Sequence, residues 1–282
     1  MKSSPDLSLL NIGYSEFNAN WNWKNIHSPF ARIYYVKSGN ARTIIDGKTY
    51  LLEANHLYLI PPFTLHDDEC DGYYSLYYIH FYEKAIHKES IFDKYNMPVG
   101  IQACHLDLNL TERLLTINPE RELGYFDPQL YDNMPTFSSY VAANNKMPFY
   151  SVMETEGILQ QLLSRFLEQA KKKSNDRDSR VNHSLKYIHE NTNKNISLTE
   201  LAGISCVTED HFIRLFKKEM NCTPTQYILS KKMEKARLLL ITSEMSIRDI
   251  AMDLSIDNIS YFNKIFKHHT GKTPGNYRKD CL

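Results

Sequence analysis

The hydrophobic and polar positions of the first hundred residues follow the pattern of β-strands. Runs rich in β-branched and aromatic residues lie at 31–37, 41–45, 49–52, 56–60 and 73–82, and turn signals separate them. Asp46-Gly47 is the strongest hairpin signal, because a type I′ turn needs a positive φ at both central positions. Several short strands at this spacing predict a β-sandwich or small barrel over residues 1–100.

The pattern changes to a helical period in residues 101–175. A short helix is predicted over 110–117, followed by an irregular stretch rich in Pro, Asn and Asp over 118–148. Apolar residues then recur at steps of three and four, which predicts one amphipathic helix over 150–172. Its apolar stripe needs a partner, either the rest of the chain or a second subunit. We therefore expect a helical linker or dimerisation region here.

The last third of the chain contains a duplicated helical pattern. The matching positions are Leu201, Ala202, Phe212 and Phe216 in the first copy and Ile250, Ala251, Phe262 and Phe266 in the second. Each copy predicts a short helix, a tight connection and a second helix with one apolar face, which is a helix-turn-helix. Between the copies Pro224 opens a helix of about 18 residues, roughly 27 Å long. Such a spacer can hold two recognition helices about one turn of B-DNA apart, roughly 34 Å.

The second helix of each copy presents polar side chains opposite its Phe residues. Thr208 caps the first of these helices, and Asp257 or Asn258 caps the second. The candidate DNA-binding residues are Thr208, Asp210, His211, Ile213, Arg214, Lys217, Lys232, Ser260, Asn263, Lys264, Lys267 and Lys272. Arg214, Asn263 and Lys264 suit base edges, and the other lysines, with Lys218, suit phosphates. The alternative is that these charges only solvate exposed helix faces, but the duplication favours DNA.

Composition and charge support this division. The chain has 33 Lys and Arg against 33 Asp and Glu, yet residues 181–282 hold 15 against 11 and residues 1–180 hold 18 against 22. The basic part coincides with the duplicated pattern. No apolar stretch is long enough for a membrane span and no secretory signal opens the chain, so we expect a cytoplasmic protein. Five cysteines without a C-x-x-C spacing argue against a disulfide framework or a zinc cluster.

Residues 181–282 resemble the DNA-binding domain of the AraC/XylS family of bacterial transcription regulators. The matching signals are Leu201-Ala202, Phe212-x-Arg214-x-Phe216-Lys217, Pro224-x-x-Tyr227, Lys235-Ala236, Ile247-x-x-Ile250-Ala251, Tyr261-Phe262-x-Lys264-x-Phe266-Lys267 and Gly271-Lys272-Thr273-Pro274-x-x-Tyr277-Arg278. Cys206 and Ser255-Ile256 depart from the family, which usually has Gly and Gly-Phe there. Because a non-Gly residue at positive φ is strained, we expect slightly remodelled turns.

The resemblance extends more weakly to the N-terminal half, where such regulators carry a cupin-like β-barrel that binds an effector. The fit lies in Ser28-Pro29-Phe30, the Gly39 turn, Asp46-Gly47, Pro61-Pro62 with His66, and the run at 77–81. The candidate effector-binding residues are Arg32, Tyr34, His66, Tyr78 and His80. Strand parity puts Arg32 and Tyr34 on one face and Tyr78 and His80 on another, without showing which face points inward.

The sequence therefore predicts an α+β chain: a cupin-like barrel with C-terminal helices, then an all-α double helix-turn-helix domain. The resemblance implies a one-component regulator, more often an activator, with promoter DNA, RNA polymerase, a small-molecule effector such as a sugar, and a second copy of the chain as partners. No catalytic residue, cofactor or metal is predicted, because His66 alone holds a plausible ligand position, which His56 or His80 could join in space. The alternatives are a regulator without an effector and a metal-dependent cupin enzyme with an accessory DNA-binding domain.

Overall fold

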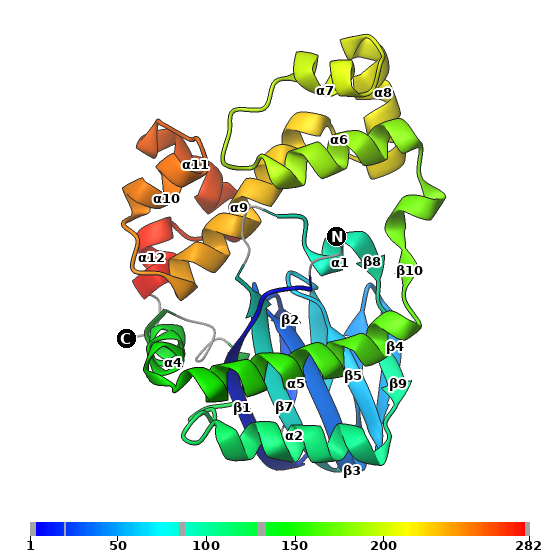
Figure 1. The fold of residues 1–282 in the computed structure, drawn as a ribbon, viewed down its shortest axis with the longest axis vertical. Coiled ribbons are helices and arrows are strands. Elements are labelled where there is room, and N and C mark those ends of the chain that lie inside the picture. Colours follow the sequence, from blue (N-terminus) through cyan, green and yellow to red (C-terminus); the bar gives the residue numbers. More distant parts are fainter. Residues whose placement is uncertain (1–3, 20, 85–87, 129–133, 280–282) are drawn as a thin grey trace. The chain divides into compact units, whose positions relative to one another are not determined.

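The computed structural model describes residues 4–19, 21–84, 88–128 and 134–279 (Figure 1). The described residues form two compact units. The first, here called the β-unit, contains residues 4–84 and 97–170, and the second, the helical unit, contains residues 88–96 and 171–279. The mixed α+β fold class predicted from the sequence is confirmed, with an antiparallel sheet in the N-terminal half and helices in the C-terminal half.

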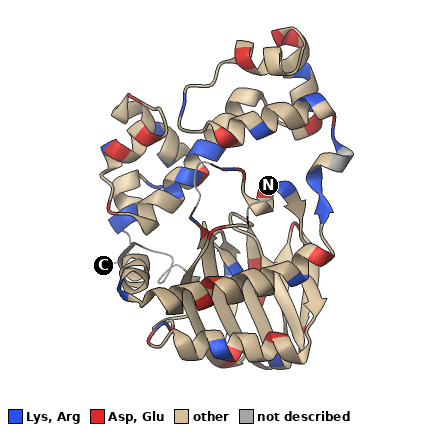
Figure 2. Cartoon of the chain, in the orientation of Figure 1, with Lys and Arg blue, Asp and Glu red and all other residues tan. Residues whose placement is uncertain are grey.

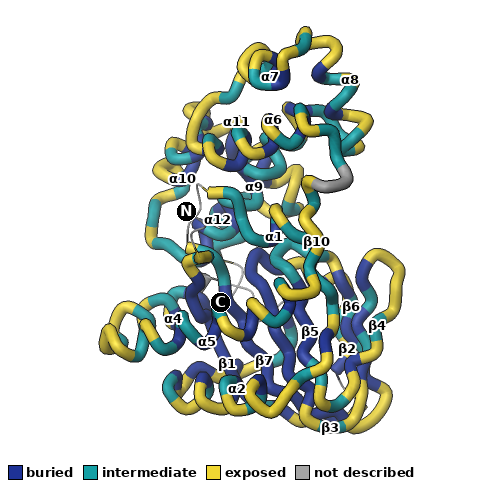
Figure 3. Tube along the Cα trace, turned by 45° about the vertical axis from the view of Figure 1, so that its right-hand side comes forward, coloured by how far each residue is buried: buried dark blue, intermediate teal, exposed yellow. Residues whose placement is uncertain are grey.

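One eight-stranded sheet with antiparallel pairing forms the framework of the β-unit. Its strands are β1 (Leu7–Asn18), β2 (Asn22–Ile26), β3 (Ala31–Ile45), β4 (Lys48–Glu53), β5 (His56–Ile60), β6 (His66–Glu69), β7 (Tyr73–Glu83) and β9 (Gly100–Gln102). The long strand β3 pairs with β5 and β7 in its first part and with β4 and β6 in its second. Buried residues run along most of these strands (Figure 3).

Gly39 lies where β3 changes partners. Its φ is +71°, and a Cβ built there would lie 2.0 Å from the carbonyl oxygen of Tyr73. Only glycine fits this position, because it tolerates the left-handed conformation and lets the two backbones touch. This conformation of Gly39 lets β3 belong to both parts of the sheet.

The predicted strands are present, but four strands of this sheet were missed. Runs 31–37 and 41–45 join into one strand, and Asp46 and Gly47 form the predicted hairpin with φ values of 50° and 74°. The missed strands are β1, β2, β6 and β9. The sequence of β6 is His-Asp-Asp-Glu, which has the composition of a loop, but pairing with β2 and β3 satisfies its backbone.

Three helices complete the described part of the β-unit: α2 (His105–Ile117), α4 (Met134–Lys146) and α5 (Phe149–Glu168). The predicted amphipathic helix is α5, which ends four residues earlier than expected, and its apolar stripe packs within the chain against β1 and α2. Helix α4 contradicts the prediction of an irregular stretch over 118–148. Phe137 and Tyr140, one helical turn apart, are both buried, and this packing outweighs the weak local propensity.

The helical unit contains the predicted double helix-turn-helix. Its elements are α1 (Ile91–Lys94), β8 (Tyr95–Asn96), β10 (Lys171–Lys172), the 3₁₀ turn η1 (Lys173–Asp176), α6 (Ser179–Glu190), α7 (Leu198–Ile204), α8 (Glu209–Met220), α9 (Pro224–Thr242), α10 (Ile247–Asp253), α11 (Ile259–Thr270) and α12 (Pro274–Lys279). Helices α7 and α8 form one helix-turn-helix, and α10 and α11 form the other. The linking helix α9 matches the predicted spacer.

Each helix-turn-helix has its own hydrophobic core. Val181 and Leu185 of α6 pack with Phe212 and Phe216 of α8 in the first core. The second core contains Phe262 and Phe266 of α11 with apolar residues of α9 and α10. The first turns of α9 pack against the first core, and its later turns belong to the second. The linking helix is thus part of both cores, so it fixes the spacing of the two copies.

Candidate nucleic-acid interface and effector site

The turns of the two helix-turn-helix units have the same geometry. Cys206 and Ser255 have φ values of 52° and 50°. In the first turn the amide of Val207 donates to the carbonyl of Ala202 at 3.1 Å, and Ile256 makes the equivalent bond in the second turn. The positive φ that led us to expect remodelled turns is therefore present at both positions, and the two turns match each other. Both residues adopt the left-handed conformation that glycine would adopt, because the flanking helices fix the backbone on both sides.

This conformation predicts that Cys206→Gly stabilises the protein. A non-Gly residue in the left-handed region is strained, so glycine should raise the free energy of unfolding of the helical unit by about 1 kcal/mol. Cys206 is exposed, so little packing is lost. Thermal unfolding followed by circular dichroism measures the change, with Cys222→Ser as the control for the loss of a thiol. A lower melting temperature for Cys206→Gly than for the wild type would contradict this explanation.

The duplication extends beyond the helix-turn-helix into the next helix. Tyr227, in the first turn of α9, has its ring centroid 5.6 Å from that of Phe216. Tyr277 of α12 lies 5.4 Å from Phe266 in the same manner. The two Pro-x-x-Tyr sequences therefore close the two cores in equivalent ways.

The N-termini of the two recognition helices, α8 and α11, are capped and ordered. The Thr208 hydroxyl accepts a hydrogen bond from the backbone amide of His211 at 3.4 Å. Of the two caps proposed for α11, Asn258 is the one used, and its side chain accepts from the amide of Tyr261 at 2.9 Å. Thr199 of α7 also donates to Glu209 at 2.6 Å. These hydrogen bonds satisfy backbone amides and so fix the first turn of each recognition helix.

The predicted DNA-binding side chains of α8 and α11 mostly face solvent. Exposed members are Thr208, Asp210, His211, Arg214, Lys217, Ser260, Lys264 and Lys267, while Ile213 and Asn263 are half-buried. Lys272, just after α11, is also exposed. The helices of this unit carry Lys and Arg as well as Asp and Glu (Figure 2), and α11 has two lysines and no acidic residue. Sequence reasoning did not select Tyr261, which is 51% exposed on the first turn of α11.

Lys232 does not belong to this surface, and its predicted phosphate contact is corrected. The side chain of Lys232 lies inside the helical unit, with 5% of the residue exposed. Its ammonium donates to the carbonyl of Lys194 at 3.0 Å and to that of Leu254, the C-cap residue of α10. Burial lowers the pKa of Lys232. Lys232 therefore ties α9 to two backbone segments instead of contacting DNA.

The register of the sheet brings the predicted effector residues together. Arg32 lies opposite His80 and Tyr34 opposite Tyr78 on the paired strands β3 and β7. Arg32 and Tyr34 therefore lie on the same face of the sheet as Tyr78 and His80, although strand parity alone had assigned the two pairs to separate faces. With His66 of β6, all five residues are buried.

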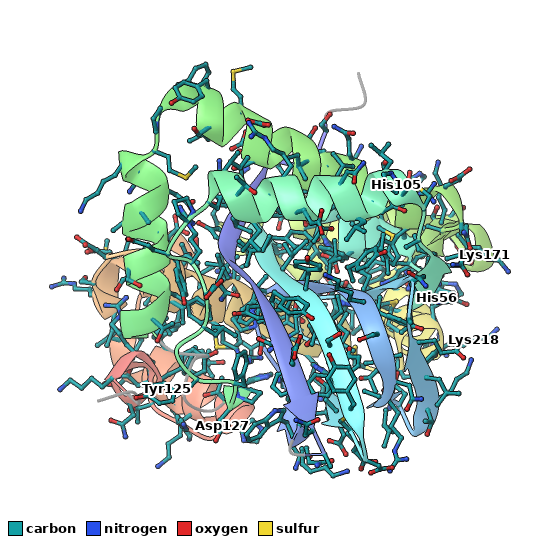
Figure 4. All side chains as sticks on the ribbon, turned by 90° about the horizontal axis from the view of Figure 1, so that it is seen from below. His56, His105, Tyr125, Asp127, Lys171 and Lys218 are labelled. Carbon is teal, nitrogen blue, oxygen red and sulfur yellow. The ribbon has the colours of Figure 1, made fainter. Side chains whose placement is uncertain are left out.

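This face points into the β-unit, because helix α2 covers the other one. Tyr77, which has the opposite parity on β7, donates its hydroxyl to Glu112 of α2 at 3.1 Å. Figure 4 shows α2 across the sheet with side chains filling the layer between them. His56, labelled there, lies on β5, and its Nδ1 is 3.0 Å from the carbonyl oxygen of Ala54.

Charged and polar groups are concentrated in the interior. Arg32 donates to the Ser28 hydroxyl at 2.6 Å, and its guanidinium lies 4.6 Å from the centre of the Phe30 ring. His66 Nδ1 is 2.9 Å from the carbonyl oxygen of Thr64, and its Nε2 is 3.8 Å from a carboxylate oxygen of Asp68. Asp68 is in a strand that was not predicted.

Burial disfavours the charged forms of His66, His80, Asp68 and Tyr74 in this interior. Loss of hydration, with the charge of Arg32 nearby, lowers the pKa of His66 to about 3. The same two causes hold the pKa of His80 well below its usual value. Burial raises the pKa of Asp68 to about 7 and that of the Tyr74 hydroxyl well above its usual value. A ligand that donates to Asp68 would therefore meet a carboxyl group that changes charge near neutral pH.

Several interior polar atoms have no hydrogen-bond partner within the described part of the chain. They include the side-chain amide of Asn11, the hydroxyls of Ser15 and Tyr74, Trp23 Nε1, His66 Nε2 and Asp68 Oδ1. Buried polar groups in proteins almost always find partners, in the protein, in water or in a ligand. Aromatic rings also line this interior. The ring centroid of Trp21 lies 5.2 Å from that of Tyr74 and 6.1 Å from that of Tyr34. The interior thus combines apolar walls with unsatisfied donors and acceptors, as small-molecule sites do.

The described residues contain no group of three or more His, Cys, Asp or Glu side chains arranged to hold a metal ion. Among the same residues, no helix is both long and apolar enough to cross a membrane.

An antiparallel β-unit with a polar interior, followed by two helix-turn-helix units, defines a DNA-binding protein with a ligand-binding domain. Comparison with known proteins agrees with this class. The family description "AraC-like ligand binding domain" matches residues 13–114, and "Helix-turn-helix domain" matches residues 201–280. The chain belongs to the AraC family of transcription regulators.

Individual relatives show how far the similarity extends. The chain is 26% identical over 164 residues to the arabinose operon regulatory protein of Escherichia coli, and the match covers 56% of each chain. The chain thus spans little more than half the length of that relative. It is 23% identical to YdiP of Escherichia coli, an uncharacterized HTH-type transcriptional regulator, over 92% of this chain and 82% of that protein. A structure of ToxT from Vibrio cholerae covers 96% of this chain with a TM-score of 0.49 and 13% identity.

Proposed function

We propose that this protein is a transcription regulator that binds specific duplex DNA through both helix-turn-helix units. The observation that carries the proposal is the matched pair of capped, exposed recognition helices, each on its own core and joined by one rigid helix. Helix α9 has 19 residues, about 28 Å at 1.5 Å per residue. Arg214 and Lys264 are the side chains for base edges, and Lys217 and Lys267 are those for phosphates.

We also propose that the polar interior of the β-unit binds a small effector, for which a sugar is the best candidate. The unpartnered donors and acceptors suit hydroxyl groups, and the rings of Trp21, Tyr34 and Tyr74 suit the apolar faces of a sugar ring. The name of the arabinose operon regulatory protein points to the same ligand class. For regulation, the effector must bind one arrangement of the chain more tightly than another.

The proposal also covers the oligomeric state of the protein, its cellular location and its contact with RNA polymerase. Phe149, Tyr150 and Met153 at the start of α5 are strongly exposed, and we assign a homodimer contact to them. Sedimentation of the purified chain at twice 33.0 kDa would support this contact, and sedimentation at 33.0 kDa would refute it. The protein acts in the cytoplasm, without catalysis, and contacts RNA polymerase at the promoter.

Arg214→Ala and Lys217→Ala test the DNA interface by different effects. Arg214→Ala should weaken binding to the preferred duplex by about 1 to 3 kcal/mol and relax discrimination at one base pair, and Lys264→Ala should do the same in the second unit. Lys217→Ala should weaken binding to all sequences alike and lower the salt slope by about one. Titration of the duplex at several salt concentrations measures both effects, with Lys186→Ala on the exposed face of α6 as the control. If Arg214→Ala changes neither affinity nor preferred sequence, this docking of α8 is wrong.

A further inference from the structure

A short arm formed by residues 88–96 belongs to the helical unit, although the neighbouring chain on both sides belongs to the β-unit. The arm contains α1 and β8 and follows β7 in the chain, while β9 follows the arm. Phe92 of the arm is buried, and the ammonium of Lys173 donates to its carbonyl at 2.8 Å. Strand β8 pairs with β10, directly before the helices of the DNA-binding domain.

Asp93 of the arm binds two helices of the helical unit at once. One carboxylate oxygen lies 3.0 Å from His189 Nδ1 on α6, and the other lies 2.8 Å from the Lys231 ammonium on α9. The other ring nitrogen of His189 is 2.9 Å from the Tyr227 hydroxyl. Lys231 also pairs with Glu234 at 2.8 Å. The arm therefore joins α6, which is part of the first helix-turn-helix core, to the linking helix.

This ionic contact is mostly removed from solvent. The side chains of Asp93, His189 and Lys231 are 24%, 5% and 18% exposed. Burial alone would raise the pKa of Asp93, but the hydrogen bond from His189 and the charge of Lys231 outweigh it and hold the pKa well below its usual value. A charge buried in this way depends on its partners, so removal of one partner is costly.

The two strands that flank the arm in the chain both reach the proposed effector site. Strand β7 carries Tyr78 and His80 on its inner face and ends at Glu83. Strand β9 begins at Gly100, where a Cβ would lie 2.7 Å from the ring of Tyr58, a residue on the same inner face as Tyr34. A ligand that moves either strand therefore acts on an end of the arm.

We propose that residues 88–96 are a coupling arm that transmits effector binding in the β-unit to the DNA-binding helices. Asp93 makes this coupling possible because it binds α6 and α9 at once. This inference rests on the proposed function of both sites. Coupling between two sites is reciprocal, so DNA bound to the helical unit must in turn change the β-unit through the same arm. That reciprocity allows a test with DNA alone.

The test compares hydrogen exchange in the full chain with and without a duplex selected from a random library. In the wild type, DNA should slow exchange in the arm and change it in β7 and β9. In Asp93→Asn, the backbone amides of the arm should exchange about tenfold faster or more. The duplex should still bind this variant but should no longer alter hydrogen exchange in β7 and β9. Lys231→Gln attacks the same contact from α9 and should give the same result if Asp93→Asn folds poorly. Glu89→Gln neutralises an acid of the same arm that pairs with Lys94 at 3.6 Å, and it should behave as the wild type.

The outcomes separate the arm from the function on which it rests. The arm is not the coupling element if DNA changes hydrogen exchange in β7 and β9 equally in the wild type, Asp93→Asn and Lys231→Gln. The same holds if DNA binds the wild type but leaves hydrogen exchange in these strands unchanged. If the wild type binds no duplex, the proposed function fails and the arm proposal fails with it.

Discussion

We expect Phe266→Ala to lower the free energy of unfolding of the second helix-turn-helix by about 3 to 5 kcal/mol, since a fully buried ring leaves a cavity. Phe266 is completely buried, and its ring lies 5.9 Å from Phe262 and 5.4 Å from Tyr277. Such a loss is a large part of the stability of a small domain. Specific DNA binding should disappear with it, because the second recognition helix is no longer held in place.

Hydrogen exchange resolved by segment is the measurement for Phe266→Ala. The two cores are separate, so amides of α10 to α12 should lose protection while those of α7 and α8 keep most of theirs. Tyr261→Ala removes an exposed aromatic side chain from the same helix and should leave protection unchanged. A loss below about 1 kcal/mol for Phe266→Ala would show that this core is not packed as described.

Asp68→Asn should stabilise the β-unit at high pH and weaken effector binding. A carboxyl group whose pKa is raised in the folded state favours folding when it is protonated. Its contribution is therefore fully present below the unfolded value near 3.8 and is lost as pH rises through about 7. Three pKa units correspond to about 4 kcal/mol, so Asp68→Asn should be more stable than the wild type by up to that amount at pH 8 and about equal at pH 4. The loss of an acceptor for a ligand hydroxyl should lower effector affinity.

Urea unfolding followed by tryptophan fluorescence isolates this effect. Both tryptophans of the chain, Trp21 and Trp23, lie in the β-unit, so the signal reports that unit alone. The lowered pKa of His66 acts in the opposite direction as pH falls below 6.5, but it is common to both proteins and cancels in the comparison. Asp71→Asn, at a strongly exposed site, is the matched control. Equal pH dependence of the wild type and Asp68→Asn between pH 5 and pH 8 would contradict the raised pKa of this buried carboxyl group.

The helical unit could be predicted closely because its signals are local. The spacing of Phe212 and Phe216, the Thr208 cap and the Pro224 helix start each depend on residues within one turn of a helix. The role of Lys232 could not be predicted, because a lysine on a helix has the same local pattern whether its ammonium reaches water or a distant carbonyl. Its partners, Lys194 and Leu254, are brought to it only by the packing of α9.

The interior of the β-unit was predicted only in part, since long-range pairing determines it. Arg32 and His80 were selected as separate candidates, but only the register of β3 on β7 shows that they share a face. Asp68 was missed because its strand is entirely polar, and Asp93 because nothing local links it to His189, nearly a hundred residues later. Tertiary contacts of this kind leave no periodic signal in a sequence.

Selection of duplexes from a random DNA library at about 0.15 M salt, close to physiological ionic strength, tests the central claim most directly. Two recognition helices joined by one rigid helix predict a motif of two short conserved blocks about one helical turn apart, roughly 10 base pairs. Arg214→Ala should erase one block and Lys264→Ala the other. Enrichment of a single block that both variants leave intact, or of no sequence at all by the folded wild-type chain, would contradict the claim that both helix-turn-helix units read DNA.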